Sequence, residues 1–213
     1  MAEYCVCVCV NVTLLLVFPS NNFSQEQVAA PVYKDGEFWV FKVTRTSGRA
    51  GRTSTAFLDG DYEVSYASGG LKAFELTGSA KVDVTPNISY LQGMFGLDAT
   101  AVEFQLLQFP LFVGQKWTRE WRARLAAEGN AIVNRRAEHR VIGIDQITTS
   151  ADTFRAFRVE RELVNVVGGR GSYTYYYSPD TKSVVKFAVT NFDPQGNMSS
   201  KSEVELLKFG TAP

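Results

Sequence analysis

The chain has 213 residues, of which 45% are hydrophobic and 21% are charged, a composition typical of a globular protein rather than a disordered one. Its 22 Lys and Arg balance its 22 Asp and Glu, so the net charge is zero and the strongly basic footprint of a nucleic-acid-binding domain is excluded. All-β domains often reach this length as one unit, so we predict a single domain.

The amino-terminal residues 1–30 are predicted to be a targeting segment. Residues 5–18 are almost entirely apolar. This stretch is shorter than the about 20 residues that a membrane-spanning helix needs, but it suits the hydrophobic region of a signal peptide. Residues 28–30 (Val-Ala-Ala) supply small residues for a cleavage site before Pro31, although Glu3 stands where Lys or Arg is expected. We therefore expect an exported mature chain that begins near Pro31 and has no stable transmembrane span.

The chain's three cysteines, Cys5, Cys7 and Cys9, all lie inside this segment. Their alternating spacing matches no zinc-binding pattern, which needs paired cysteines and further ligands. We interpret them as small hydrophobic residues of the targeting segment. A thiol cluster or a lipid-modified cysteine is the alternative.

From residue 31 onward, turn residues recur between short runs of alternating apolar and polar residues, a pattern that predicts an all-β domain over 31–213. Residues 84–100 are irregular, and Leu91, Met94, Phe95 and Leu97 within them could form one short helical turn. We expect an antiparallel curved sheet, a half-barrel or a sandwich-like arrangement, with at most short helical segments. The predicted strands cover residues 38–43, 53–58, 61–67, 71–76, 102–108, 116–125, 131–148, 153–166, 172–178, 182–192 and 201–209. The side chains predicted to be buried in this sheet are those of Trp39, Trp117, Phe154 and Phe157.

One short pattern occurs twice. Gly36 is followed three residues later by Trp39, and Gly114 is followed three residues later by Trp117. Each pair opens a predicted strand, which is compatible with two similar β-layers in one domain. Two matching residues also arise by chance, so both interpretations stand.

Four blocks together resemble a family of uncharacterised bacterial exported β-rich domains. Residues 109–117 (FPLFVGQKW) are similar to the family's "PL-x-VG-x-x-W" opening. Residues 141–148 (VIGIDQIT) resemble its "V-x-G-x-E-x-V" block, and residues 151–159 (ADTFRAFRV) resemble its "AGTF" block. Residues 175–186 (YYYSPDTKSVVK) resemble its "YSPe…vVK" block.

This resemblance implies a periplasmic or secreted bacterial protein with an antiparallel sheet, but it supplies no activity and no catalytic residues. The chain departs from the family pattern at Asp152, which replaces a glycine, and at Asp145, which stands where Glu is common. The turn that contains Asp152 is therefore expected to differ from that of the relatives.

No catalytic or metal-binding constellation is predicted. His139 is the only histidine, and no G-x-S-x-G nucleophile motif accompanies it, so we interpret it as a surface or edge residue. Glu160 and Glu162 share one face of a strand, which leaves carboxylate-pair hydrolysis formally open; cross-strand ion pairs with Arg158 and Arg161 are the simpler interpretation. We therefore predict no enzyme activity and no cofactor.

The window 116–140 is locally basic. Because its strands alternate charged with apolar residues, we interpret the charges as a solvated outer face of the sheet. The basic residues are Lys116, Arg119, Arg122, Arg124, Arg135, Arg136 and Arg140.

An aromatic cluster is the strongest candidate for a binding site. Tyr173, Tyr175 and Tyr177 alternate on one face of a strand, and Trp117 and Trp121 are in phase on another. If these rings are exposed, they could line an apolar groove or stack on sugars. If they are buried, they are core.

The predicted function is an exported, non-enzymatic β domain that binds an apolar small molecule, a lipid or an envelope protein. One alternative is a structural or interaction subunit of an envelope or surface complex. A hydrolase is the other.

Overall fold

The computed structural model of the chain describes residues 26–47, 59–84, 95, 105–125, 131–164 and 169–212, which form strands, turns and irregular segments but no helix. Accordingly, the described ranges contain no helix long and apolar enough to cross a membrane. The strands are β1 (Gln27–Val28), β2 (Glu37–Ser47), β3 (Gly60–Ala67), β4 (Gly70–Thr77), β5 (Ala80–Asp83), β6 (Leu111–Phe112), β7 (Lys116–Leu125), β8 (Ala131–Thr148), β9 (Thr153–Val164), β10 (Arg170–Ser178), β11 (Ser183–Phe192) and β12 (Met198–Thr211).

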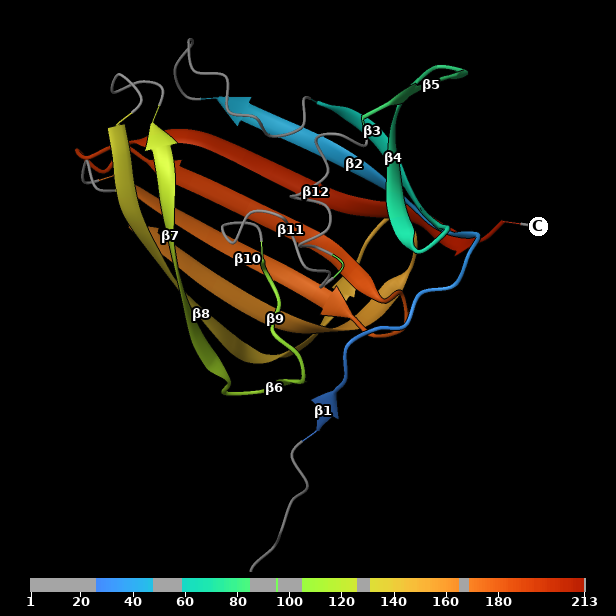
Figure 1. The fold of residues 1–213 in the computed structure, drawn as a ribbon, viewed down its shortest axis with the longest axis horizontal. Helices are drawn as coiled ribbons and strands as arrows, with labels where there is room; N and C mark the ends of the chain where they lie inside the picture. Colours follow the sequence, from blue (N-terminus) through green and yellow to red (C-terminus); the bar gives the residue numbers. More distant parts are fainter. Residues whose placement is uncertain are drawn as a thin grey trace, which may run out of the picture.

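Ten of these strands form one curved antiparallel sheet in the order β5-β4-β3-β2-β12-β11-β10-β9-β8-β7 (Figure 1). Each strand pairs with its neighbour in sequence, except where β2 pairs with β12. The sheet is open, with β5 and β7 at its two edges, and β1 and β6 form a separate two-stranded sheet. The predicted fold class, an all-β antiparallel curved sheet, is confirmed.

Predicted and observed strands agree best where apolar and polar residues alternate over a long stretch of sequence. The ranges 116–125 and 131–148 coincide with β7 and β8. Residues 105–108 of a predicted strand are irregular instead, because adjacent Leu106 and Leu107 are both buried. The strands β1, β5 and β6 were not predicted, since two to four residues are too few to show a period. The predicted strand 53–58 lies outside the described residues, as does the predicted helical turn apart from Phe95.

One face of the sheet, called here the inner face, carries the hydrophobic core. Cross-strand register aligns Val141, Val159, Tyr175, Phe187 and Val204 in one row of this face. The core also takes in side chains from outside the large sheet, namely Phe95, Leu106, Leu107 and Leu111. The part of the inner face that holds the row of Val141 to Val204 is therefore filled by the protein's own chain. The four side chains predicted to be buried, Trp39, Trp117, Phe154 and Phe157, all have exposed fractions of 7% or less.

Aromatic residues fasten the start of β2 to the turn between β10 and β11. The indole Nε1 of Trp39 donates a hydrogen bond of 2.7 Å to the carbonyl oxygen of Thr181. The Tyr33 hydroxyl donates to the carbonyl oxygens of Lys182, at 2.8 Å, and of Phe95. The Tyr33 ring also meets that of Trp39 edge-on, with centroids 5.7 Å apart. Sequence-distant segments are thus locked together at this end of the sheet.

The Gly-x-x-Trp pattern found twice in the sequence is also a repeat in three dimensions. Gly36 and Gly114 have φ angles of 88° and 87°, in the region that favours glycine. Gly36 precedes β2 and Gly114 precedes β7, and the backbone N–H of each donates to a carbonyl of the strand that pairs with it, Tyr66 of β3 at 3.0 Å and Val141 of β8 at 2.8 Å. Three residues later, Trp39 and Trp117 each enter the core. The match therefore extends from two residues to a shared turn geometry.

The segment just before the expected cleavage position is ordered against the domain. Gln27 and Val28 pair with Phe112 and Leu111 of β6, and Glu26 forms an ion pair with Arg155. Cleavage before Pro31 would remove β1 and this ion pair. That cleavage position stays a prediction, and the predicted signal-peptide core at residues 5–18 lies outside the described residues.

Truncation of Trp39 is expected to destabilise the fold strongly. Trp39→Ala removes a ring with 2% exposure and its hydrogen bond to Thr181, which should lower the free energy of unfolding by about 3–5 kcal/mol. Phe38→Ala is the matched control, because Phe38 is adjacent but half-exposed, and about 1 kcal/mol or less is expected there. Urea denaturation measures both. Equal losses in the two variants would contradict the assignment of the inner face.

Candidate functional site

Three of the five predicted ligand-binding aromatics, Trp117, Tyr175 and Tyr177, belong to the hydrophobic core. Tyr175 and Tyr177 have exposed fractions of 0% and 1%. The Tyr175 ring stacks on that of Phe187 in β11, with centroids 4.8 Å apart and planes inclined by 2°. Tyr177 meets the ring of Phe109, which precedes β6, edge-on at 5.3 Å. The two tyrosine rings therefore pack inside the domain and offer no surface to a ligand.

Trp117 and the two remaining aromatics, Trp121 and Tyr173, lie on the same inner face, where Tyr173 packs against the core to which Trp117 belongs. Cross-strand register joins Trp117 of β7, His139 of β8, Arg161 of β9 and Tyr173 of β10 in one row. Trp121 stands further along β7, opposite Arg135. Three of the predicted site residues thus surround basic side chains.

His139 is not the surface or edge residue that the sequence suggested. Its exposed fraction is 3%, and its ring stacks on Trp117 with centroids 4.8 Å apart and planes inclined by 7°. Burial, together with the positive charges of Arg161 and Arg119, lowers the pKa of His139 from 6.5 to about 3. The imidazole is therefore neutral at physiological pH and lies in a positive local field.

Arg161 also differs from its prediction as a partner of Glu160 and Glu162. Successive side chains of a strand alternate between faces, so Arg161 points inward while both glutamates point outward. Arg161 is only 4% exposed. Its guanidinium lies 4.7 Å from the ring centroid of Tyr173 and 5.4 Å from that of Trp121. These two rings hold the cation by cation–π contact.

Arg119 and Arg135 complete the cluster, and both overturn the prediction of a wholly outer basic face. Arg119 lies between Trp117 and Trp121 in the alternation of β7, opposite fully buried Ala137, and Arg135 lies opposite Trp121. Both arginines are half-buried. The term basic cluster is used below for Arg119, Arg135, His139 and Arg161. The sequence did contain a signal for this inward orientation. Each member of the cluster is an even number of residues away from buried apolar residues of its own strand, so it points to the same face as they do.

Several polar atoms of the cluster are buried without a hydrogen-bond partner in the described part of the chain. They are the Nε atoms of Arg119 and Arg135 and, beside the cluster, the indole Nε1 of Trp117. No inner-face position of β7 to β10 whose side chain is described carries a carboxylate. An unsatisfied buried donor costs roughly 1–3 kcal/mol, so such a concentration requires an explanation.

Tyr173 closes one side of the cluster because the next inner-face position of β10 is a glycine. A Cβ atom added to Gly171 would lie 2.7 Å from Cε2 of Tyr173 and 3.0 Å from the side-chain oxygen of Asn191. The Tyr173 ring can therefore pack against the backbone of β10 at residue 171 only because that residue has no side chain.

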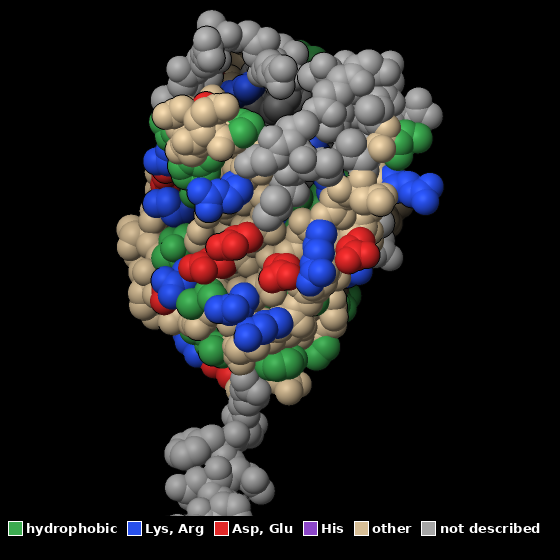
Figure 2. Space-filling view, turned by 90° about the vertical axis from the view of Figure 1, so that its left-hand side faces the viewer, with side chains coloured by type: hydrophobic (Ala, Val, Ile, Leu, Met, Phe, Trp, Pro, Cys, Tyr) green, Lys and Arg blue, Asp and Glu red, His purple; other side chains and the backbone are tan. Residues whose placement is uncertain are grey.

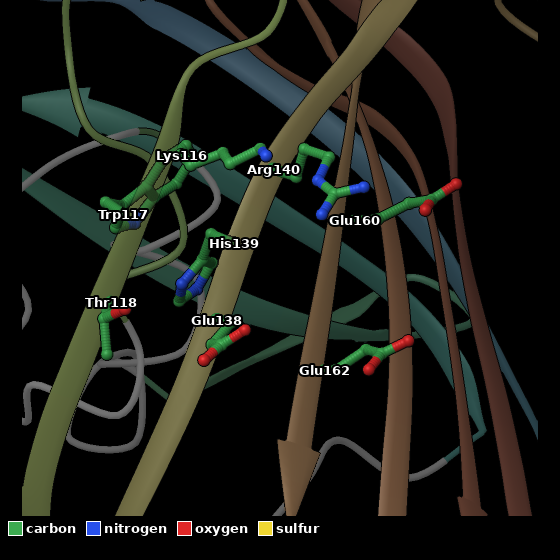
Figure 3. Close-up of a pocket in the computed structure, with 8 residues that line it drawn as sticks. All are labelled: Lys116, Trp117, Thr118, Glu138, His139, Arg140, Glu160 and Glu162. Carbon is green, nitrogen blue, oxygen red and sulfur yellow. The ribbon is translucent and has the colours of Figure 1, made fainter.

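A hollow of about 330 Å³ on the same strands is lined by outer-face side chains and by the stacked pair Trp117 and His139. The side chains that reach it from this face have mixed charge: Lys116, Thr118, Glu138, Arg140, Glu160 and Glu162. In Figure 3, Glu160 and Glu162 extend to one side of the strands while Trp117 and His139 extend to the other. Figure 2 shows both signs of charge interspersed on the side of the molecule where β7 and β8 lie.

The outer face therefore matches the predicted solvated surface. Arg158 forms ion pairs there with Asp145, at 3.3 Å, and with Glu160, at 3.7 Å. Nowhere in the described ranges do three or more His, Cys, Asp or Glu side chains gather as they would to hold a metal ion.

Replacing both core tyrosines should unfold the protein rather than empty a site. Tyr175→Ala and Tyr177→Ala each remove a fully buried ring, at a cost of about 3–5 kcal/mol per ring. The double variant is expected to lose its near-ultraviolet circular dichroism. A folded double variant with unchanged thermal stability would show that these rings are not core.

Burial of a neutral His139 should make stability fall in acid. The unfolded chain binds a proton near pH 6.5 while the folded chain resists it down to about pH 3, so this contribution is complete above 6.5 and is lost as pH decreases. Between these two pKa values, the free energy of unfolding should fall by about 1.4 kcal/mol for each pH unit of acidification. His139→Phe keeps the stack on Trp117 but lacks the titration, so the variant's denaturation midpoint should fall less steeply with acid. Parallel curves for both proteins would contradict the burial of His139.

Two solved structures resemble this fold at low similarity. One is of a protein inferred to be exported, with a YmcC-like fold, from Bacteroides fragilis NCTC 9343; it has 11% identity and a TM-score of 0.32, covering 87% of this chain and 100% of that one. The other is of an inferred lipoprotein from Parabacteroides distasonis ATCC 8503, with 12% identity, a TM-score of 0.36 and the same coverage of 87% and 100%. No family model matches the chain, and no curated protein matches its sequence. At these TM-scores, neither structure supports an inference about location or function.

Proposed function

We propose that this chain is an extracytoplasmic, non-catalytic binding domain that receives an apolar or amphipathic small molecule on the inner face of β7 to β10. The observation that carries the proposal is the group of buried polar atoms without a hydrogen-bond partner on Arg119, Arg135 and Trp117. The apolar stretch at residues 5–18 supports the extracytoplasmic location.

The inner face has an apolar part around Tyr175 and a basic part around Arg161, and the difference between them favours the basic part as the position of the ligand. The part around Tyr175 is filled by Phe95, Leu106, Leu107 and Leu111, which come from outside the large sheet. The part around the basic cluster instead presents aromatic walls and unpartnered donors. Apolar walls with a few convergent polar groups are typical of small-molecule sites.

Binding is favoured over catalysis by the state of the only histidine. A general base that works near neutral pH needs a pKa close to that pH, whereas the pKa of His139 is lowered to about 3. Its ring nitrogens contact no nucleophilic side chain among the described residues.

A small ligand is favoured over a partner protein by the distribution of exposed apolar side chains. Val32, Val82, Ile132, Met198 and Phe209 are the exposed large hydrophobics of the described residues. They are spread over the segment before β2, over β5 and β8, and over both ends of β12. A protein-binding surface would gather such residues into one patch.

Native mass spectrometry of the exported protein tests the proposal. We expect a small apolar molecule to be released on denaturation, and we expect the stripped protein to take up the fluorescent fatty acid cis-parinarate. Trp121→Ala, which removes one half-buried wall of the site, should weaken this uptake, whereas Phe38→Ala on the outer face should leave it unchanged. A protein that carries no ligand and takes up no cis-parinarate would rule the proposed function out.

A further inference from the structure

One edge of the large sheet is long and has no neighbouring strand among the described residues. β7 ends the sheet at one side and pairs only with β8 (Figure 1). It has 10 residues, whereas β5 at the opposite edge has 4. A long unpaired edge presents a row of backbone N–H and C=O groups along which another strand can form.

The backbone groups on this edge belong to the even-numbered residues of β7. The N–H of Val141 in β8 donates to the carbonyl oxygen of Gln115 at 2.9 Å. From there the antiparallel register continues without a bulge to Leu125. Odd-numbered residues therefore bond to β8, and even-numbered residues turn their N–H and C=O groups away from it. The even positions from 116 to 124 are called here the open edge.

β2, which matches β7 in the repeated Gly-x-x-Trp pattern, has the corresponding edge filled. The two turns are closed in the same way. The N–H of Glu37 donates to the carbonyl of Lys34 at 3.1 Å, and a second bond of this kind, 3.2 Å long, joins Gln115 to Phe112. After its turn, β2 pairs with β3 as β7 pairs with β8, but its other edge pairs antiparallel with β12. The same local architecture thus accepts an antiparallel strand in one copy and lacks one, among the described strands, in the other.

The charges of β7 select the kind of strand that can pair with it. Lys116 and Arg122 are exposed on the outer face. In the register with β8, Lys116 lies opposite Arg140 and Arg122 lies opposite Asn134, so neither cation has a carboxylate directly across from it. Over its whole length β7 contains one lysine and three arginines against Glu120 alone. The open edge is therefore positive.

A second copy of β7 is a poor partner for this edge. Antiparallel self-pairing centred on Arg119 would set that arginine opposite its own copy and Lys116 opposite Arg122. Centring the pair on Glu120 would set two glutamates face to face and Lys116 opposite Arg124. Like charges directly opposite each other are destabilising, and cations on an edge strand are a common protection against self-association. The same charges favour a strand that brings carboxylates.

We propose that the open edge of β7 is a docking site for an acidic, extended segment of a partner protein. The segment joins the sheet as an antiparallel strand beside β7, as β12 does beside β2. Main-chain hydrogen bonds to the even-numbered positions supply affinity, and carboxylates opposite Lys116 and Arg122 supply selectivity.

This docking site is separate from the inner-face position proposed for a small molecule. Strand addition uses backbone groups, so it does not require exposed hydrophobic side chains to gather in one patch. The inference therefore goes beyond the proposed function, and either of the two can fail without the other.

The probe is a fluorescein-labelled, end-capped peptide of sequence ETEVTETVE. In antiparallel register along residues 124 to 116, its glutamates lie opposite the four cations of β7, and its central threonine lies opposite Glu120. One control peptide, KTKVTKTVK, has the opposite charge. The other is the acidic peptide N-methylated at its fifth and seventh residues, whose N–H groups would otherwise donate to the carbonyls of Glu120 and Thr118.

Fluorescence anisotropy of the labelled peptides measures binding. We expect saturable binding of the acidic peptide at low salt and binding about tenfold weaker or less for each control peptide. Added NaCl should weaken the binding, because the charges involved are exposed.

Variants of Thr118 test the backbone contribution directly. Thr118→Pro removes one outward N–H of the open edge without removing a bond to β8, whereas the matched control Thr118→Val keeps that N–H. The proline variant should bind the acidic peptide at least about fivefold more weakly, and the valine variant should bind it as the unmodified protein does.

A charge reversal tests the chemistry of the partner without altering the backbone. Lys116→Glu combined with Arg122→Glu should exchange the preference for the acidic peptide for a preference for the basic one. Near-ultraviolet circular dichroism and thermal melting establish that each variant is folded.

Three results would overturn the inference. The folded protein could show no saturable binding of the acidic peptide, or its binding could be unaffected by both N-methylation and Thr118→Pro. Equal affinity for the acidic and basic peptides would remove the proposed partner chemistry. None of these results affects the uptake of cis-parinarate, which tests the inner-face site separately.

Discussion

The pairing of β2 with β12 holds the domain together. It aligns residues 37–47 with residues 200–211 and is the one contact in the large sheet between strands distant in sequence. Without it the chain would form two separate antiparallel meanders, each with another exposed edge. The hydrogen bonds of Trp39 and Tyr33 to the β10–β11 turn reinforce the joint from the inner side. Because this contact closes the longest loop, it carries the largest entropic cost of chain closure in the fold.

Once the sheet is closed in this way, its inner face divides into two parts with different chemistry. Around Tyr175 and Phe187 the face is apolar and is covered by the chain itself. Around His139 and Arg161 it is basic and aromatic, and the Nε atoms of Arg119 and Arg135 and the indole Nε1 of Trp117 have no hydrogen-bond partner among the described residues. Stability alone does not account for the second part, because apolar residues of similar volume would pack there without a desolvation cost. We infer that the first part stabilises the fold and that the second is retained for binding.

Sequence patterns predicted the fold well and the site poorly, for identifiable reasons. The lengths of β7 and β8 followed from alternation, whereas the strand predicted over 102–108 is irregular at 105–108, where adjacent Leu106 and Leu107 are both buried. Alternation also separates the two faces of a strand, and Arg119 shares its face with Trp117 and Trp121. That signal was outweighed by the expectation that arginine is exposed. The contact of Arg161 with Tyr173 and Trp121, and the stack of His139 on Trp117, depend on the register of four strands. No single strand contains that information.

The three tryptophans allow the division of the inner face to be tested in one experiment. The indole N–H of Trp39 donates a hydrogen bond to the carbonyl oxygen of Thr181 in the apolar part, whereas Trp117 and Trp121 flank the basic cluster. Their indole N–H resonances can be assigned by single Trp→Phe substitutions and followed by NMR during titration with oleate. If the ligand binds at the basic part of the inner face, the Trp117 and Trp121 resonances will shift together and saturate while that of Trp39 stays in place. A shift confined to Trp39, or equal shifts at all three, would contradict binding at that part.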